Sequence, residues 1–286
     1  MHNVDMRCEL LSLIFRLAGR PEYSSDTTDY QKSLIANFSQ FTNHPAVAYA
    51  RDYGNGYGAP IAYAIRMNWE NEKCTHLYDI PDLAVYGWDE TWLSNFIPLI
   101  NDFYTVTKFG EFFQENVPYY HEVSARFNDQ LYRKFNKDWF AKYGIKPEFL
   151  RVSLSPNRSG GGFGPSIKDG NGNIVMVYPN LPDLEDYSSR MPFLVHEFCH
   201  SFADSIGQKF YEESEMYRKI CDEAMGADGT LPEYNAILPI IVEYATRAYT
   251  ILYLVENEGK DPAELFPSDI DKGFPHIAEV YAMIKP

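Results

Sequence analysis

Paired cysteines and an uninterrupted apolar run are both missing from the sequence. Its four cysteines form no C-x-x-C pair, so they do not make a disulfide framework, and we expect buried thiols. The longest apolar run, residues 237–255, contains a proline, a glutamate and an arginine, so no segment is predicted to cross a membrane. The first residues place acids before a short amphipathic run, which is not the pattern of a signal peptide. We therefore expect a soluble protein, exported or in the cell envelope if a leader was trimmed, and otherwise cytoplasmic.

Positive charge is also scarce. The chain has 25 Lys and Arg against 40 Asp and Glu, which gives a net charge of −15. Nucleic acids and anionic membrane surfaces would repel such a protein, so we predict no nucleic-acid partner and no membrane insertion. An apolar content of 45% is typical of a globular protein, and 286 residues can bury a sizeable core.

One motif carries recognisable chemistry. The sequence F-L-V-H-E-F-C-H-S-F, residues 193–202, holds two histidines four residues apart, with a glutamate directly after the first. On an α-helix His196 and His200 lie one turn apart on one face, so both imidazoles can reach a single ion. Glu197 lies about 100° around the helix from His196, beside the ion, where it can accept a proton from water. The motif predicts a zinc site that activates water.

The residues that flank the motif favour the same interpretation. Between Met191 and Asp204 there is no lysine, and Glu197 is the only glutamate, whereas a solvent-exposed helix would carry several of both. Most of the remaining side chains are apolar, as a helix buried beneath a cleft requires. The alternative is a buried helix whose histidines form hydrogen bonds with the backbone.

Hydrophobic periodicity divides the chain into two regions. Residues 1–145 predict a helical region, with a first helix that closes at Gly19 and a second from about Thr28 to Phe41. Residues 56–68 are ambiguous between helix and strand. Residues 146–286 predict a small sheet, the motif helix and C-terminal helices, the first of them from about Gln208 to Met225. Strands are expected at 148–157 and 171–180, with a turn at 168–173, and they could pair as a hairpin. The predicted fold class is α+β and mostly helical, in one compact two-lobed unit.

A glycine cluster lies between the two expected strands. It comprises Gly160, Gly161, Gly162 and Gly164. No lysine follows in the G-K-[ST] position and no helix opens directly after it, so a phosphate-binding loop is not predicted. We expect a flexible loop at the rim of a cleft.

A catalytic zinc takes three protein ligands and leaves one position for water, so a third ligand is needed. The class that continues H-x-x-G-x-x-H is excluded, because Ala203 and Ile206 occupy the glycine and histidine positions. Asp204 would lie about 12 Å along the helix from His196, too far for a short side chain to reach back. It fits better as a supporting or helix-end residue.

A glutamate from a later helix is the remaining option. Glu243 and Arg247 are the only charges across about twenty apolar or weakly polar residues, and a buried carboxylate is costly unless it is paired or binds a metal. We therefore predict Glu243 as the third ligand. The charged stretch that contains Glu212, Glu213 and Glu215 is the alternative. A buried Glu243–Arg247 ion pair would also explain the two charges, and Arg247 could then hold the ligand or face the substrate.

The motif H-E-F-C-H, followed by a buried glutamate downstream, resembles the zincin metallopeptidases of the glutamate-ligand class, the gluzincins, which include the thermolysin-like enzymes. The wider pattern E-L-L-S-L-I-F-R-L-A-G, N-H-P-A-V, H-E-F-C-H-S-F and E-Y-A-T-R-A-Y is similar to the bacterial domain-of-unknown-function family 4932, regarded as metallopeptidases. This second resemblance covers nearly the whole chain. It implies a cleft with the motif helix as its floor and the small sheet as its upper wall, where an edge strand aligns an extended peptide.

The chain departs from the glutamate-ligand class at one position. Those enzymes often have E-x-x-x-D, whose aspartate orients the first histidine, whereas here the fourth residue after Glu243 is Arg247. An arginine cannot accept that hydrogen bond. The orienting group must come from elsewhere, and Asp204 and Asp222 are the candidates.

The expected function is zinc-dependent hydrolysis of a peptide or protein substrate. One Zn²⁺ per chain would be held by His196, His200 and Glu243, with Glu197 as the general base. The rival interpretations are a zinc hydrolase of a non-peptide amide or ester, and a catalytically silent zincin-fold binding protein. The presence of Glu197 favours an active enzyme.

A further donor is needed to stabilise the oxyanion that forms during hydrolysis. Arg247 and Tyr249 are predicted for this role, and Tyr244, His276 and His121 are alternatives. The sequence does not choose among them.

Overall fold

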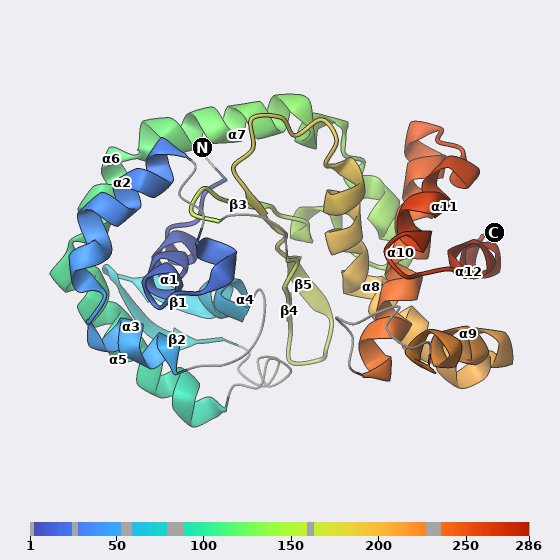
Figure 1. Cartoon of the computed structure of the whole chain (residues 1–286), viewed down its shortest axis with the longest axis horizontal. Helices are drawn as coiled ribbons and strands as arrows, with labels where there is room; N and C mark the ends of the chain where they lie inside the picture. Colours follow the sequence, from blue (N-terminus) through green and yellow to red (C-terminus); the bar gives the residue numbers. More distant parts are fainter. Residues whose placement is uncertain are drawn as a thin grey trace. The chain divides into compact units, whose positions relative to one another are not determined.

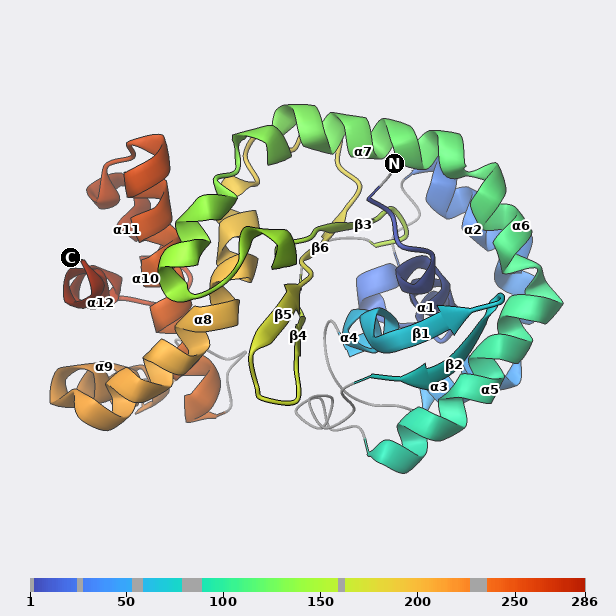
Figure 2. The same ribbon diagram turned by 180° about the vertical axis from the view of Figure 1, so that it is seen from behind.

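The computed structural model describes residues 3–24, 28–52, 59–78, 89–158, 163–226 and 236–285. These residues form two units (Figures 1 and 2): unit 1 comprises Met1–Lys134 and Arg151–Ser188, and unit 2 comprises Phe135–Leu150 and Ser189–Pro286. The expected boundary near residue 145 differs from this division, because residues 151–188 group with unit 1. The predicted fold class, α+β and mostly helical, is confirmed.

Unit 1 is built mainly from helices. Its α-helices are α1 (Met6–Leu17), α2 (Asp29–Phe38), α3 (Pro45–Arg51), α4 (Ala59–Arg66), α5 (Glu90–Thr107), α6 (Phe109–Glu115) and α7 (Val117–Gln130). Its 3₁₀ turns are η1 (Pro21–Tyr23), η2 (Ser39–Phe41) and η4 (Tyr132–Lys134). Its strands are β1 (Met67–Glu70), β2 (Lys73–Leu77), β3 (Ser153–Ser155), β4 (Ser166–Lys168), β5 (Ile174–Val177) and β6 (Asn180–Pro182).

Helix α1 is the core of unit 1. Every residue from Cys8 to Leu17 is buried, so this helix is enclosed on all sides (Figures 1 and 2), which suits its nearly continuous apolar sequence. The N-cap Asp5 accepts a hydrogen bond from the backbone N–H of Arg7, and Gly19 follows the helix with a positive φ of 86°. The helix predicted to close at Gly19 is therefore confirmed.

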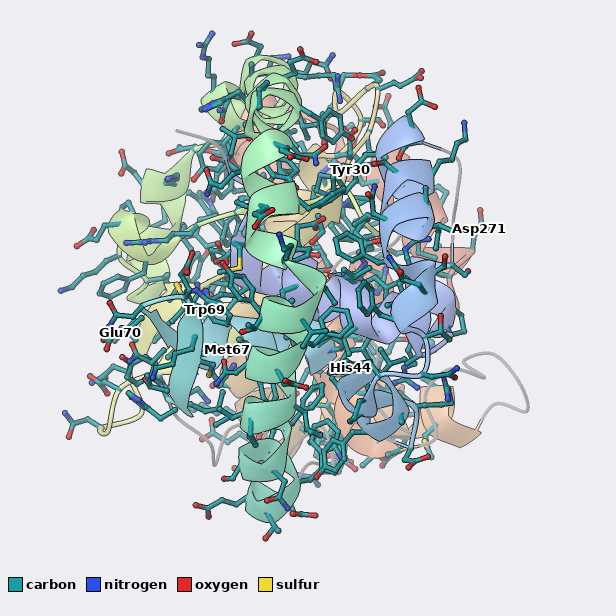
Figure 3. The ribbon with its side chains drawn as sticks, turned by 90° about the vertical axis from the view of Figure 1, so that its left-hand side faces the viewer. Tyr30, His44, Met67, Trp69, Glu70 and Asp271 are labelled. Carbon is teal, nitrogen blue, oxygen red and sulfur yellow. The ribbon has the colours of Figure 1, made fainter. Side chains whose placement is uncertain are left out.

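Aromatic side chains fill the space between α1 and the outer helices of unit 1. Figure 3 shows α5 with Trp69 of β1 on one side and with Tyr30 and His44 on the other. Tyr30 stacks on Tyr119 with ring centroids 5.2 Å apart, and His44 packs edge-on against Phe103 at 5.1 Å. Helix α2 begins with a complete capping box at Thr28, where a helix was expected to start.

The strands pair differently from the prediction. The expected strands at 148–157 and 171–180 do not form one hairpin; instead β3 pairs with β6 in parallel, and β4 pairs with β5 across the 169–173 turn. Strand β4 was not predicted. The parallel pairing of β3 with β6 leaves no local signal in the sequence, because the two strands lie far apart along the chain. The segment 56–68, which was ambiguous between helix and strand, contains both: residues 59–66 form α4, and residues 67 and 68 begin β1. Gly160, Gly161 and Gly162 lie outside the described residues.

Unit 2 contains the motif helix. Its helices are η5 (Lys137–Tyr143), η6 (Pro147–Phe149), α8 (Met191–Glu213), α9 (Glu215–Gly226), α10 (Ile237–Glu258), α11 (Pro262–Ile270) and α12 (Ile277–Ile284). Helix α8 packs lengthwise against α10. The motif helix continues without a break through Gly207, where the sequence indicated that a new helix begins.

Gly207 explains how closely α8 and α10 approach. A Cβ atom at this position would lie 2.8 Å from the carbonyl oxygen of Ile241 and 2.9 Å from the Cβ of Ala245. Real Cβ contacts are longer than this, so glycine is required for the observed approach. The hydroxyl of Tyr217 on α9 donates to the same carbonyl oxygen, at 2.5 Å, and so ties α9 to this crossing.

The opposite face of α8 packs on aromatic rings. Phe198 stacks on Phe135 with centroids 5.0 Å apart, and Phe202 stacks on Tyr143 at 4.2 Å. Phe198 and Phe202 alternate with His196 and His200 along the helix, so the aromatic rings and the imidazoles point to different faces. The motif helix therefore buries one face against η5 and turns the histidine face toward α10.

Helix α10 combines great length with an apolar sequence. By length and composition it could cross a membrane, although the sequence analysis predicted no such segment. In the structure 67% of its apolar window is buried within the protein, as in the core helix of a globular fold. The expected burial of the thiols is confirmed, because Cys8, Cys74, Cys199 and Cys221 are all buried and free.

Candidate metal centre and active site

Three predicted ligand atoms converge between α8 and α10. The Nε2 atoms of His196 and His200 lie 3.2 Å apart. Glu243 Oε2 lies 3.6 Å from His196 Nε2, and Glu243 Oε1 lies 3.5 Å from His200 Nε2. The three side chains are 13% to 23% exposed, so they are partly sheltered but still reachable from solvent.

These separations fit a tetrahedral ion. A zinc at about 2.0–2.2 Å from its N and O ligands holds those ligands about 3.3–3.6 Å apart, which is the edge of the tetrahedron. The three observed separations, 3.2, 3.5 and 3.6 Å, lie close to that edge. Imidazole nitrogen and carboxylate oxygen are ligands that zinc takes in catalytic sites. The donor set therefore fits zinc in both chemistry and spacing.

Glu243 is incompletely satisfied by its neighbours. Its Oε2 atom is buried and accepts no hydrogen bond among the described residues, although Arg247 Nη2 lies 2.9 Å away as an ion-pair partner. Burial alone would raise the pKa of Glu243, but the charges of His196, His200 and Arg247 outweigh it and hold that pKa well below its usual range. The carboxylate is therefore ionised and ready to bind a cation.

Arg247 is shared between two carboxylates. Its Nη1 atom donates to Asp269 Oδ1 of α11 at 2.7 Å, while Nη2 faces Glu243. Its guanidinium carbon also lies 4.2 Å from the ring centroid of Phe274. Arg247 therefore forms the ion pair with Glu243 that was the alternative from the sequence, but Asp269 shares the same guanidinium and Glu243 still faces the two histidines.

Asp204 supports the second histidine. Its Oδ1 atom lies 2.8 Å from His200 Nδ1, and Thr246 Oγ1 donates to the same oxygen at 3.3 Å. A carboxylate at Nδ1 keeps the proton on that nitrogen and leaves the Nε2 lone pair for an ion. Burial would lower the pKa of His200, but the hydrogen bond and charge of Asp204 outweigh it and raise the pKa to about 9.

This arrangement differs from the expected orienting group of His196. Asp204 contacts His200 rather than His196, and the other candidate, Asp222, instead accepts a hydrogen bond from Tyr211 at 2.8 Å. Within the described residues no side chain contacts His196 Nδ1. Asp204 is thus a supporting residue, as the sequence indicated, but it supports His200 rather than His196.

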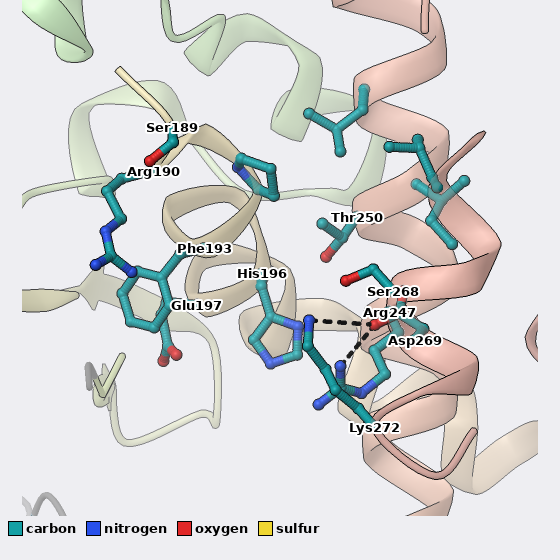
Figure 4. A pocket seen from close by; sticks show the side chains of 14 residues that line it. Ser189, Arg190, Phe193, His196, Glu197, Arg247, Thr250, Ser268, Asp269 and Lys272 are labelled. Atoms are coloured by element: carbon teal, nitrogen blue, oxygen red, sulfur yellow. Dashed lines mark hydrogen bonds and ion pairs between the residues drawn. The ribbon is translucent and has the colours of Figure 1, made fainter. Parts of the chain in front are cut away.

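A pocket of about 520 Å³ opens beside this cluster, within unit 2 (Figure 4). Glu197 and His196 line it from α8, and Arg247 lines it from α10. In Figure 4 Glu197 lies on one side of His196 and Arg247 on the other. The Glu197 residue is 8% exposed, and among the described residues no partner contacts its carboxylate. A free, sheltered carboxylate next to the donor cluster is suited to proton transfer.

Arg247 is the oxyanion candidate that lines the pocket. Tyr249 instead packs edge-on against Phe202 and Tyr143, with centroids 5.1 and 5.2 Å away, in the aromatic cluster on the other side of the helix. Tyr244 packs against Phe274.

The structure does not bring the remaining candidates to the pocket lining. His276 lies near two glutamates, Glu223 and Glu279. Glu212, Glu213 and Glu215 are exposed where α8 ends and α9 begins. His121 and the predicted strands belong to unit 1. A peptide-aligning strand beside the metal site therefore stays a prediction.

Several residues of the site were not identified from the sequence. Thr246 supports Asp204, and Asp269 and Lys272 line the pocket beside Arg247. Thr246 carried a usable signal, because it is a polar residue three positions after Glu243 in an apolar helix. Asp269 and Lys272 lie in a region of mixed polar residues, where no pattern marks them.

No protein-family model, curated protein or solved structure matches the chain.

Proposed function

We propose that the protein is a zinc-dependent hydrolase of peptide bonds, with unit 2 as a zincin-like catalytic unit of the glutamate-ligand class. One observation carries the proposal: two imidazole nitrogens and a carboxylate oxygen lie at the spacing of a tetrahedral site, beside a pocket with a free glutamate. The sequence resemblance to the zincins and to domain-of-unknown-function family 4932 supports the same function.

The zinc ligands in this proposal are His196, His200 and Glu243. When bound, Zn²⁺ would lower the pKa of water and polarise a substrate carbonyl. Asp204 holds the His200 ring with Nε2 directed at the site. Arg247 holds the Glu243 carboxylate and is itself held by Asp269.

Glu197 supplies the proton transfers. Its carboxylate accepts a proton from the attacking water and later delivers that proton to the leaving amine. The sheltered position of Glu197 keeps competing water away and strengthens these transfers. Arg247, which lines the same pocket, provides positive charge near the developing oxyanion, in place of the predicted Tyr249.

The proposal is tested by metal content and turnover together. Purified protein should contain about one zinc per chain by elemental analysis. Glu197→Gln should retain the zinc but lose about 10²–10⁴-fold in kcat on a generic protein substrate, because the base is gone. Glu212→Gln, an exposed glutamate near the end of the same helix, is the matched control and should change neither value.

Four outcomes would count against the proposal. Peptide cleavage by metal-free wild-type protein would defeat it, and unchanged activity in Glu197→Gln would exclude that residue as the base. Zinc binding with hydrolysis of esters or non-peptide amides alone would favour the small-substrate rival. Zinc binding without any hydrolysis would favour a silent binding protein.

A further inference from the structure

The pocket beside the donor cluster has chemically distinct ends. Near the donors it is lined by His196, Glu197 and Arg247. Much of the remaining lining is apolar and comes from Pro192, Phe193, Ile251, Leu254 and Leu265, with Ser189, Thr250 and Ser268 as small polar residues among them. A volume of about 520 Å³ is in the range of pockets that enclose a small ligand, so it can hold a short stretch of peptide.

The antiparallel packing of α8 and α10 sets this order. Gly207 of α8 contacts Ile241 near the start of α10, whereas the first turn of α8 shares the pocket with Leu254 near the end of α10. Moving from His196 toward the start of α8 therefore also moves toward the end of α10. Arg190 precedes His196 by six residues, which is about 9 Å along the helix axis.

Arg190 differs from the other cations of the pocket. Arg247 contacts Glu243 and Asp269, and Lys272 Nζ lies 3.8 Å from Asp269. Arg190 is exposed, and its guanidinium has no ion pair or hydrogen bond among the described residues. In Figure 4 it lies beside Phe193 at the margin of the pocket. In a chain of net charge −15, an unpaired cation at a pocket rim is complementary to an anionic group on a ligand.

We propose that the pocket binds the last two residues of a peptide chain, with an apolar side chain against Ile251, Leu254 and Leu265 and the terminal carboxylate on Arg190. An extended chain advances about 3.3–3.6 Å per residue, so a carboxylate two residues past the scissile bond lies about 7 Å from it. That position is within reach of a guanidinium whose backbone lies about 9 Å from His196 along α8. This inference rests on the proposed function and specifies its substrate class.

The predicted reaction is the release of a C-terminal dipeptide. Water adds across the second peptide bond from the end, so the shortened chain gains a carboxylate and the dipeptide gains a free amine. Arg190 takes no part in the proton transfers and acts by positioning the substrate. Its effect should therefore depend on the charge of the substrate's C-terminus.

Kinetics with matched substrates test this dependence. Peptides with an apolar penultimate or final residue are prepared with either a free C-terminal carboxylate or a C-terminal amide. We expect kcat/KM to be at least about tenfold higher for the free acid, because a charge-assisted contact is worth at least about one order of magnitude. Arg190→Gln should remove that preference and leave the amide unchanged. Lys209→Gln, which removes an exposed lysine from the same helix, should change neither substrate.

Binding measurements provide a readout that does not require turnover. An apolar dipeptide and its C-terminal amide are titrated into zinc-loaded Glu197→Gln protein by calorimetry. The free acid should bind at least about tenfold more tightly than the amide, and Arg190→Gln in the same background should abolish the difference. Circular dichroism of each variant checks that it is folded.

The outcomes separate this inference from the proposed function. If both peptide forms are cleaved equally in a Glu197-dependent manner, the hydrolase proposal stands and the C-terminal assignment is wrong. If no peptide is cleaved but the free dipeptide still binds through Arg190, the pocket assignment stands and peptide hydrolysis is wrong. Equal binding of the acid and the amide overturns the inference in either case.

Discussion

Two buried glutamates, Glu9 in unit 1 and Glu243 in unit 2, occupy similar sequence contexts but opposite electrostatic environments. Each lies on a mostly apolar helix that also carries arginine, Arg7 and Arg16 in α1 and Arg247 in α10. By the sequence argument that selected Glu243 as a ligand, Glu9 would qualify as well. Their surroundings in the structure decide between them.

Glu9 has mostly neutral neighbours. It is 1% exposed, and the hydroxyl of Tyr30 donates to its Oε2 atom at 2.8 Å. Tyr30 in turn contacts the hydroxyl of Tyr120 at 2.9 Å, while Arg16 forms hydrogen bonds with Asn157. Burial raises the pKa of Glu9 to about 7, because the hydrogen bonds from Tyr30 and Ser155 and the charge of Arg16 only partly offset it.

Glu243 has cationic neighbours instead. Two histidines and an arginine face its oxygens, and their charges lower its pKa although burial acts in the opposite direction. The comparison shows that a buried carboxylate does not by itself indicate a metal site. The metal site is identified by a second helix, α8, whose histidine nitrogens lie close to the same carboxylate.

Replacing Glu243 should break the metal site. We expect Glu243→Gln to lower zinc affinity by more than about 100-fold, since loss of a direct ligand should exceed the 10–100-fold effect of a supporting residue. Competition with a chromogenic chelator measures the change. The equivalent substitution in unit 1, Glu9→Gln, should leave zinc affinity unchanged. Equal zinc affinity in wild type and Glu243→Gln would falsify the assignment of the third ligand.

The second-largest effect should be on the pH dependence of unit 1. Because folding raises the pKa of Glu9 to about 7, the stabilising contribution of its protonated form is complete below about pH 4.5 and is lost as the pH rises through about 7. The loss amounts to about 3 kcal/mol in the free energy of unfolding. Glu9→Gln mimics the neutral acid, so it should be more stable than wild type at pH 8 by up to that amount and similar to wild type at pH 5.

Hydrogen exchange of the α1 amides in urea, at pH 5 and pH 8, follows unit 1 separately from unit 2. Glu70→Gln, on an exposed position of β1, is the control and should not alter the pH dependence. If wild-type α1 is equally protected at both pH values, after correction for intrinsic exchange, Glu9 is not held neutral.

Local patterns in the sequence predicted much of the fold. Helix α1 and its Gly19 terminus, the start of α2 near Thr28 and the turn after β4 all depend on residues close together in the chain. The parallel pairing of β3 with β6 and the grouping of residues 151–188 with unit 1 depend on distant contacts. Those contacts leave no period in the sequence, which is why the expected sheet was wrong in its pairing.

The site was predictable to the extent that its chemistry follows helical spacing. His196, Glu197 and His200 are one turn of one helix, and Glu243 stood out as a charge in an apolar segment. Tyr249 could not be excluded in advance, because its orientation depends on the aromatic cluster contributed by η5. The partner of each histidine likewise depends on how α8 and α10 meet.

Asp204 should control the pH dependence of the metal site. Zinc must displace the proton of His200, whose pKa is raised to about 9, so zinc affinity should rise as the pH increases toward 9. In the metal-free protein the sign is reversed: the stabilisation from protonated His200 is complete below about pH 6.5 and is lost as the pH rises through 9.

We expect Asp204→Asn to lower zinc affinity about 10–100-fold at pH 9, where the His200 proton competes least in the wild type, since the support at Nδ1 is lost. The rise of affinity with pH should then level off nearer pH 6.5, the ordinary pKa of histidine. Chelator competition between pH 6 and pH 9 measures both effects, and Asp222→Asn is the matched control. An unchanged pH profile in Asp204→Asn would show that another group sets the protonation of His200.

The smallest expected effect comes from Gly207, which lets α10 approach α8. An added methyl group would overlap Ile241 O and Ala245 Cβ, and overpacking of this kind costs about 1–3 kcal/mol. Alanine regains up to about 1 kcal/mol of helix propensity, so Gly207→Ala should lower the stability of unit 2 by about 1–2 kcal/mol. The strain should also move α10 away from α8 and with it Glu243 from the two histidines. Zinc affinity should therefore fall severalfold, and Glu243, like Glu9, should have mostly neutral neighbours.

Gly170→Ala, where an added Cβ meets no neighbouring atom, is the control for the glycine change itself. Full zinc affinity together with reduced stability in Gly207→Ala would show that the ligands do not depend on this close approach.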